Sequence, residues 1–277
     1  MRNEKNKFKK KITKSTMASK ADRYKLYEAS VQCAETEVDF VEYEFKKLRG
    51  RRPALLREDF CGTAAVCFEW VSRRKENIAL GIDIDAEVLS WGTENHLPAL
   101  KAAVRSNVKL IKGDVLTVST PRQDVILAMN FSYWLFKKRK LLLAYFKKVR
   151  KNLQADGIFF LDCFGGSDAY RELKERTKLD GFTYVWDQAA YNPVNSDINC
   201  HIHFHFPDKS KLERAFTYDW RLWTLPEIRE LLLDAGFSEV IIYARAVDAI
   251  TDQPTRMEPV SCMDADLGWI AYIGALN

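Results

Sequence analysis

Apolar and polar positions along residues 50–165 predict strands and helices in alternation. Short apolar runs predict buried strands, whereas apolar positions with a period of 3.6 residues predict helices. After a helical opening at about 22–48, the predicted strands cover residues 53–60, 78–84, 108–114, 124–131 and 157–164. The predicted helices between them cover residues 63–74, 86–104 and 140–154.

The end of the chain continues this pattern. A last predicted helix lies between Thr224, its expected cap, and Gly236, its expected stop, and strands at 239–244 and 269–276 follow. Strands that are apolar on both faces and separated by helices belong in a parallel sheet that helices cover on both sides. We therefore expect a doubly wound α/β fold with a mostly parallel, seven-stranded sheet.

Residues 182–222 interrupt the alternation. Aromatic and β-branched runs with period-two stretches lie at 182–191, 198–206 and 212–220, and turn-forming residues separate them. The pattern predicts a small antiparallel β insert, which we place within 168–222 on the substrate side of a single domain spanning 21–277.

Charge is unevenly distributed along the chain. The net charge is +5, but residues 1–20 contain eight Lys or Arg and one Glu, which leaves −2 for the remaining residues. We expect residues 1–20 to form a disordered basic tail. A nucleic-acid partner is disfavoured by the acidic body and stays open only through this tail.

Hydropathy and cysteine usage predict the compartment. No apolar run approaches the length needed to cross a bilayer, and the N-terminus is charged where a signal peptide would be apolar. The six cysteines include no CxxC pair. We expect a soluble, cytoplasmic protein with no membrane partner.

Acidic residues follow three successive predicted strands. Glu58 precedes a turn with Gly62, Asp83 follows about 20 residues later, and Asp114 ends the third strand. Ligands of doubly wound sheets bind at the carboxyl ends of the strands, and a carboxylate at the position of Asp83 suits the hydroxyls of a ribose. Taken singly, Gly62 is a helix-entry turn, Asp83 a cap and Asp114 a turn former.

The chain resembles the class I S-adenosylmethionine-dependent methyltransferases across about 50–165 and again over 224–276. LREDFCGTA lies over the family's glycine-rich first motif, with Glu58 at the acidic position and Gly62 at the central glycine. Phe60 and Ala64 replace the outer two glycines. The resemblance implies that S-adenosyl-L-methionine is the cofactor, that Asp83 binds its ribose and that Asp114 faces its adenine.

The resemblance also assigns further cofactor contacts in the opening helix and in the loops after the strands. The full predicted set is Tyr24, Glu58, Phe60, Cys61, Gly62, Asp83, Ile84, Asp114, Val115, Asn130 and Phe131. Aromatic faces attract a sulfonium cation, although aromatic residues at helical spacing are also typical of a core. A nicotinamide enzyme is disfavoured because an intact GxGxxG is absent.

Aromatic residues after the fourth strand and in the insert form the predicted acceptor side. They are Tyr133, Trp134, Tyr218 and Trp220, each of which is also compatible with a core role. An amine acceptor must lose a proton before attack, and the candidates that could take it, without ranking, are Tyr133, Asp162, His203 and Tyr218. We expect no metal, because His201, His203 and His205 lie along one strand.

These features predict an enzyme that transfers a methyl group by in-line displacement to a nitrogen or oxygen atom of a small molecule. One alternative is an RNA or protein methyltransferase that uses the basic tail. Another is a non-catalytic adenosylmethionine-binding protein, which the bulky Phe60 in the first motif suggests.

Overall fold

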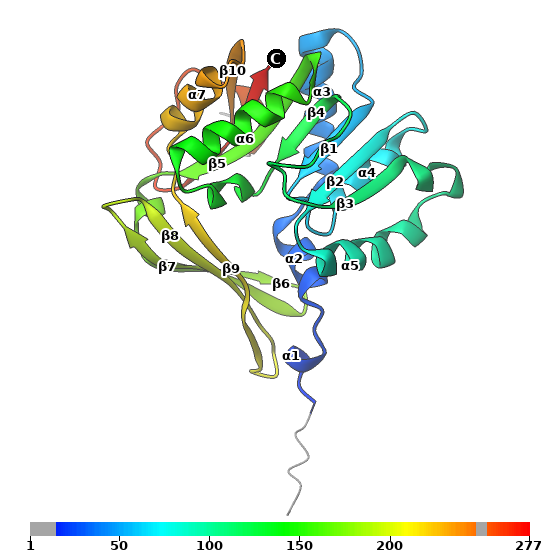
Figure 1. The fold of residues 1–277 in the computed structure, drawn as a ribbon. Helices are drawn as coiled ribbons and strands as arrows, with labels where there is room; N and C mark the ends of the chain where they lie inside the picture. The colour runs from blue at the N-terminus through cyan, green and yellow to red at the C-terminus, as the bar shows by residue number, and fades with distance from the viewer. Residues whose placement is uncertain (1–14, 248–253) are drawn as a thin grey trace, which may run out of the picture.

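An eight-stranded sheet forms the centre of the molecule. The computed structural model describes residues 15–247 and 254–277. The strands are β1 (Leu55–Asp59), β2 (Ile78–Asp83), β3 (Val108–Lys112), β4 (Gln123–Ala128), β5 (Leu153–Gly165), β10 (Glu239–Val247), β11 (Pro254–Pro259) and β12 (Trp269–Leu276). Their order is β11-β10-β12-β5-β4-β1-β2-β3, so β3 and β11 are the edge strands (Figure 1).

The predicted doubly wound fold is confirmed, with one additional strand. β12 runs antiparallel to both β5 and β10, β11 runs antiparallel to β10, and the other pairs are parallel. All seven expected strands are present. β11 was not predicted, because the sequence PTRMEP has neither an apolar run nor period-two alternation and carries two prolines.

Helices cover both faces of this sheet. One face carries α3 (Ala34–Arg49), α4 (Ala65–Arg73) and α5 (Ala86–His96), and the other carries α6 (Arg139–Lys151) and α7 (Leu225–Asp234). Four short 3₁₀ helices are η1 (Leu97–Ala99), η2 (Ala102–Asn107), η3 (Ser132–Leu135) and η4 (Ser167–Tyr170). The hydroxyl of Thr224 caps α7 in a capping box with Glu227, as the sequence predicts for this residue.

Two predicted helices are interrupted. The opening helix divides into α2 (Arg23–Val31) and α3, because Gln32 and Cys33 leave the helical conformation between them. The second predicted helix ends at His96, and Pro98 lies within the first of the two 3₁₀ helices that follow. Proline lacks the N–H that would continue the α-helical hydrogen bonds, which explains this early end.

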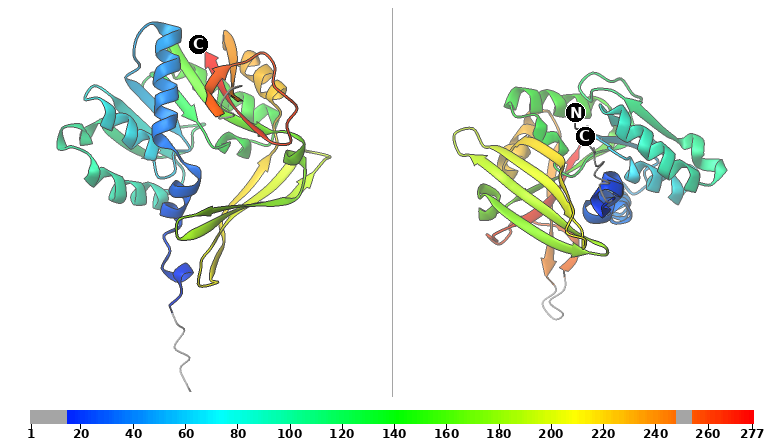
Figure 2. Two further views of the ribbon diagram at one scale, coloured as in Figure 1. Left: turned by 180° about the vertical axis from the view of Figure 1, so that it is seen from behind. Right: turned by 90° about the horizontal axis from the view of Figure 1, so that it is seen from below.

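The predicted insert is a separate four-stranded antiparallel sheet. Its strands are β6 (Leu173–Leu179), β7 (Phe182–Asn192), β8 (Asp197–His205) and β9 (Lys211–Arg221), in sequence order. The charged edge strand β6 was not predicted from LKERTKL, although the Asp180–Gly181 pair that turns it into β7 is a typical hairpin signal. Figures 1 and 2 show this sheet below the central one, with α2 beside it.

The first described residues lie on this second sheet. The helical turn α1 (Met17–Lys20) donates its Met17 N–H to Asp208 Oδ2 at 2.8 Å and its Ala18 N–H to Ser210 Oγ at 3.0 Å. The part of the predicted tail that the structure describes, residues 15–20, therefore contacts the loop between β8 and β9, whereas residues 1–14 lie outside the described part of the chain. Among the described helices, none combines the length and apolar character that a bilayer span requires.

Gly92 lets α5 approach the loop after β1. A Cβ atom added at Gly92 would lie 2.1 Å from the backbone oxygen of Thr63. An alanine within an exposed helix is normally about 1 kcal/mol more favourable than glycine. Here the contact is with backbone, which cannot rotate away, so the added methyl group must displace the loop or the helix.

We expect Gly92→Ala to lower the free energy of unfolding by about 1–3 kcal/mol, the usual cost of overpacking. Urea unfolding followed by circular dichroism measures this change. Gly268→Ala is the matched control, because nothing lies within 4 Å of its added Cβ. A Gly92→Ala protein as stable as the parent would show that the loop does not constrain α5.

Candidate functional site

The loop after β1 has the backbone conformation of a glycine-rich turn, although it contains only one glycine. Phe60, Gly62 and Ala64 have φ angles of 58°, 54° and 60°, so every second residue is left-handed. The Phe60 ring packs toward Phe136 and Tyr145, with centroid distances of 6.0 and 5.6 Å. A large side chain is tolerated at position 60 because it is anchored in an aromatic cluster.

Asp83 joins the loops that follow β1 and β2. Its Oδ2 accepts a hydrogen bond from the Gly62 N–H at 2.8 Å, and its Oδ1 accepts one from the Asp85 N–H at 2.9 Å. The next residue, Ile84, is 70% exposed, although it is a large apolar side chain. The sequence prediction placed both residues beside the cofactor, and the structure places them side by side at the rim of the sheet.

Asp114 lies at the end of the neighbouring edge strand. The Gly113 N–H donates to the Asp83 backbone oxygen at 2.9 Å, which brings the ends of β2 and β3 together. The exposed Asp114 carboxylate accepts the Leu116 N–H at 2.8 Å and so also forms its own turn. Cys61 and Val115 are buried, which gives these two predicted contacts packing roles in this structure.

Glu58, the acid of the predicted first motif, is buried inside the sheet. It is 6% exposed, and the Cys67 thiol donates to its Oε2 at 3.2 Å. Burial raises the pKa of Glu58 to about 8, and the bond from Cys67 opposes this shift only in part. Glu58 therefore lies behind the rim that Asp83 and Asp114 occupy.

Asp162 holds the turn that follows β4. Its two carboxylate oxygens accept the N–H groups of Asn130 and Phe131 at 2.9 and 2.8 Å. Both donors are left-handed, with φ of 57° and 58°, a conformation that is strained for a bulky residue. Burial raises the pKa of Asp162 to about 7 while these two bonds lower it. In this structure both oxygens of Asp162, which sequence predicted as a possible proton acceptor, hold the backbone of this turn.

Tyr24 connects the antiparallel sheet to the rim. Its hydroxyl donates to Glu87 Oε1 at 3.1 Å in the first turn of α5, and its ring lies 5.4 Å from that of Trp91 and 6.1 Å from that of Phe216. The Arg23 guanidinium adds an ion pair to Glu87 at 3.1 Å. Sequence analysis identified Tyr24 but missed these partners, because nothing in the pattern indicates which helix packs against α2.

The predicted acceptor residues divide into two groups. Tyr218 and Trp220 stack at 4.3 Å on the face of the antiparallel sheet that contacts the core. Tyr133 and Trp134 have no exposed surface, and the Tyr133 hydroxyl donates to the Asp162 backbone oxygen at 2.7 Å. The structure therefore places this second pair in the core, where it supports the turn after β4.

His203 lies on the opposite face of the antiparallel sheet from Tyr218 and Trp220, because adjacent strand residues point to opposite faces. Its Nε2 pairs with Asp187 at 3.2 Å, and its Nδ1 contacts Glu213. The predicted role of His203 as a proton acceptor beside the cofactor does not fit this placement. In the part of the chain that the structure describes, no group of His, Cys, Asp or Glu is arranged to hold a metal ion.

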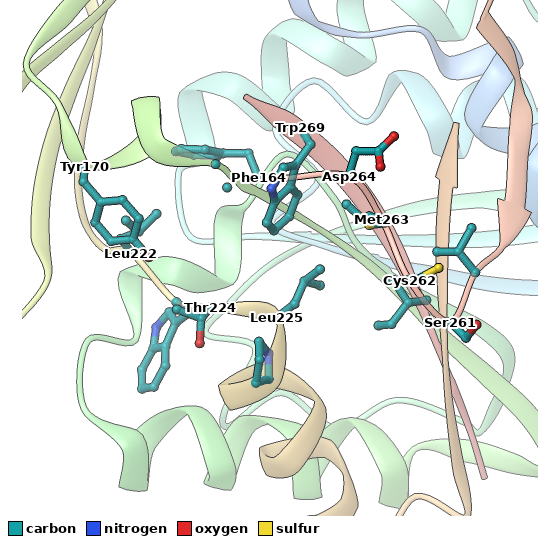
Figure 3. A pocket seen from close by; sticks show the side chains of 16 residues that line it. Phe164, Tyr170, Leu222, Thr224, Leu225, Ser261, Cys262, Met263, Asp264 and Trp269 are labelled. Carbon is teal, nitrogen blue, oxygen red and sulfur yellow. The ribbon is translucent and has the colours of Figure 1, made fainter. Parts of the chain in front are cut away.

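An apolar cavity of about 560 Å³ lies between the end of β5, the start of α7 and the residues before β12 (Figure 3). Its lining includes Phe164, Tyr170, Leu222 and Trp269 and none of the predicted cofactor residues. The Phe164 ring lies 4.9 Å from that of Phe131. The cavity is therefore adjacent to the turn after β4, and its volume is typical of a ligand site.

Comparison with solved structures confirms the fold. DesVI of Streptomyces venezuelae matches with a TM-score of 0.64 and 15% identity over 92% of this chain and 98% of that one. A S-adenosylmethionine-dependent methyltransferase from Clostridium acetobutylicum matches with a TM-score of 0.63 and 16% identity over 91% and 97% of the two chains. A SAM-bound amino pentose methyltransferase from Micromonospora echinaspora matches with a TM-score of 0.62 and 13% identity over 92% and 97%. No protein-family model and no curated protein matches the sequence.

Replacement of Asp162 tests whether it holds the strained turn. We expect Asp162→Asn to lower the free energy of unfolding by about 1–3 kcal/mol, because an amide accepts through one oxygen only and leaves one of these two part-buried N–H groups without a partner. Thermal or urea unfolding measures the loss. Asp180→Asn removes an exposed carboxylate and is expected to change stability by less than about 0.5 kcal/mol. Equal stability of the two variants would show that the turn does not need Asp162.

The raised pKa of Glu58 predicts a pH-dependent stability. The unfolded carboxyl loses its proton near its ordinary pKa of 4.5, whereas the folded one keeps it up to about 8. Between these values the unfolded chain binds fewer protons, so the contribution of this group to the stability of the parent falls as pH rises, by roughly 1 kcal/mol per pH unit. We expect Glu58→Gln to lack this contribution when urea unfolding is measured from pH 5 to 8. Parallel stability profiles for parent and variant would contradict it.

Proposed function

We propose that this protein is an S-adenosylmethionine-dependent methyltransferase that acts on a small molecule. The observation that carries the proposal is the hydrogen bond from the Gly62 N–H to Asp83 at 2.8 Å. It joins a left-handed turn after β1 to a carboxylate after β2, at the carboxyl ends of the strands where doubly wound sheets bind nucleosides. The fold shared with solved methyltransferases supports the same conclusion.

The residues at the rim fit an adenosine group. Each Asp83 oxygen accepts one backbone bond and has a lone pair left for a ribose hydroxyl. The exposed Ile84 side chain offers an apolar surface to an adenine ring, and the Asp114 carboxylate on the next strand can accept its amino group. Among the similar solved structures, one is described as SAM bound and another as complexed with S-adenosyl-L-homocysteine.

The chain's own residues would align the reactants and exclude water. When bound, S-adenosylmethionine would supply the methyl group for an in-line displacement. The turn at Asn130 and Phe131, held by Asp162, fixes an aromatic ring next to the apolar cavity. Burial raises the pKa of the Tyr218 phenol well above its usual range, so this residue would stay protonated and would not act as a base. Alignment is therefore the main contribution that the protein makes.

We place the acceptor on the side of Phe131, where the aromatic rings of Trp186, Tyr218 and Trp220 lie within 6.4 Å of one another. Similar solved proteins are described as a sugar N-methyltransferase and a glycopeptide N-methyltransferase, which supports a nitrogen atom of a small molecule as the acceptor. The bulky Phe60 in the first motif suggested a non-catalytic binding protein. This alternative has less support, because the Phe60 ring packs toward Phe136 and Tyr145.

Methyl transfer from labelled cofactor tests the proposal directly. The protein is incubated with methyl-labelled S-adenosylmethionine and either a panel of amino sugars or a metabolite extract, and mass spectrometry identifies any product. We expect label in a small molecule and none in RNA or protein. Label in RNA or protein instead, or tight cofactor binding without transfer to any acceptor, would favour one of the alternatives.

Asp83→Asn tests the ribose contact. The amide has a single acceptor oxygen where the carboxylate has two, so we expect the Kd for S-adenosylhomocysteine to rise about 10–100-fold, as for the loss of a charged hydrogen bond. Isothermal titration calorimetry measures the affinity. Asp85→Asn is the matched control, since asparagine retains the cap that Asp85 provides to the Glu87 N–H. An unchanged Kd in Asp83→Asn would remove Asp83 from the site.

A further inference from the structure

Glu37 is a buried acid with an unused hydrogen-bond acceptor. It lies in the first turn of α3 and is 7% exposed. Its Oε2 is fully buried and has no hydrogen-bond partner within the described residues. A buried carboxylate oxygen without a partner is costly, so it indicates either a protonated group or a missing ligand.

The packing of α3 places Glu37 above the end of β5. Phe40 lies one helical turn after Glu37 and therefore on the same side of the helix. Its ring is 5.0 Å from that of Tyr272, and Tyr272 is paired with Asp162 in the sheet. Because α3 runs toward the start of β1, its first turn lies nearer to the carboxyl ends of the strands than the rest of the helix does (Figures 1 and 2). Glu37 belongs to this first turn.

Glu58 lies on this same face of the sheet. It pairs with Leu127 of β4, which pairs with Phe160 of β5, two residues before Asp162. Three elements therefore bring Glu37, Glu58 and Asp162 to one face near the carboxyl ends. Burial, together with the nearby Glu58 and Asp162, holds the pKa of Glu37 well above its usual range.

Within the described residues, no Lys, Arg or His forms an ion pair with these acids. Glu58 is bonded to a thiol and Asp162 to two backbone N–H groups, and none of the ion pairs within residues 15–247 and 254–277 includes Glu37, Glu58 or Asp162. Burying carboxyl groups without a cation is unfavourable. A cationic ligand at this position would remove that cost.

S-adenosylmethionine has two cationic groups, a sulfonium and an ammonium. The unpaired oxygen of Glu37 can form a hydrogen bond with only one of them. A sulfonium has no hydrogen to donate, whereas an ammonium group has three donors. The strand order β2-β1-β4-β5 places a ribose held by Asp83 at one end of the rim, with Asp162 at the other. The amino-acid portion of the cofactor would therefore extend from Asp83 across the end of β1 toward Glu37.

We propose that Glu37 accepts a hydrogen bond from the α-ammonium group of the cofactor's methionine moiety. This inference rests on the proposed function, and it assigns to α3 a binding residue outside the strand-end loops. Glu37 would thus contribute to the affinity for the amino-acid part of the ligand and not to the affinity for its adenosine part.

Two ligands that differ only in the amino-acid part test this role. S-adenosylhomocysteine carries the ammonium group, whereas 5′-methylthioadenosine retains the adenosine and a thioether without the amino acid. We expect Glu37→Gln to raise the Kd for S-adenosylhomocysteine about 10–100-fold in calorimetry and to leave that for 5′-methylthioadenosine unchanged within about twofold. Glu35→Gln, an exposed acid in the same turn, is the matched control and is expected to change neither.

The opposite results would overturn the inference. An equal loss for both ligands, no loss for either, or the same loss in Glu35→Gln would each show that Glu37 does not bind the ammonium group. Failure of the folded parent to bind S-adenosylhomocysteine would instead overturn the proposed function.

If Glu37→Gln does not fold, ligand binding to the unsubstituted parent protein still tests the inference. The analogue of S-adenosylhomocysteine that lacks only the amino group should bind the parent about 10–100-fold more weakly than S-adenosylhomocysteine does. Glu37→Asp, which keeps the charge but shortens the side chain, should reduce this difference. Equal affinity of the parent for the two ligands would exclude an ammonium contact at any carboxylate.

Discussion

The arrangement of the candidate site depends on one short contact, the bond from the Gly62 N–H to Asp83. It requires the chain to reverse tightly after β1, which the left-handed residues at positions 60, 62 and 64 achieve. It also requires α5 to lie close to the reversed chain, which Gly92 permits. The ends of β1 and β2 are also held by their strand pairing, so losing any of these conditions would loosen the two loops that follow the strands, and with them the groups that we propose face the ligand.

Sequence patterns predicted most of the central fold because the buried strands and helices each bury a continuous apolar face. The same patterns predicted Asp83 and Asp114 at neighbouring strand ends, since parallel strands finish on one edge. They did not predict β6 or β11, whose polar sequences are those of solvent-facing edge strands. A periodic apolar pattern indicates which side chains are buried, and these two edge strands bury few of their side chains.

Sequence analysis missed Glu37 and the partners of Phe60 and Asp162, because these depend on tertiary contacts. Phe60 departs from the glycine pattern of the motif. The structure explains how it is accommodated, because its ring packs toward Phe136 and Tyr145. Glu37 lies on a helix that also carries the exposed acids Glu35 and Asp39, and only the packing of α3 distinguishes it from Glu35. Similarly, Asp162 is an ordinary strand residue in sequence, and its two bonds to the turn after β4 appear only in three dimensions.

The two edge strands of the central sheet affect the tendency of the protein to aggregate in a crowded solution. Unpaired backbone groups on an edge strand invite another chain to add a strand, the first step of edge-to-edge aggregation. Here β11 begins and ends with proline, which has no N–H to offer, and β3 carries Lys109 and Lys112. Charge and proline thus protect both edges of a sheet whose interior strands are among the most apolar segments of the chain.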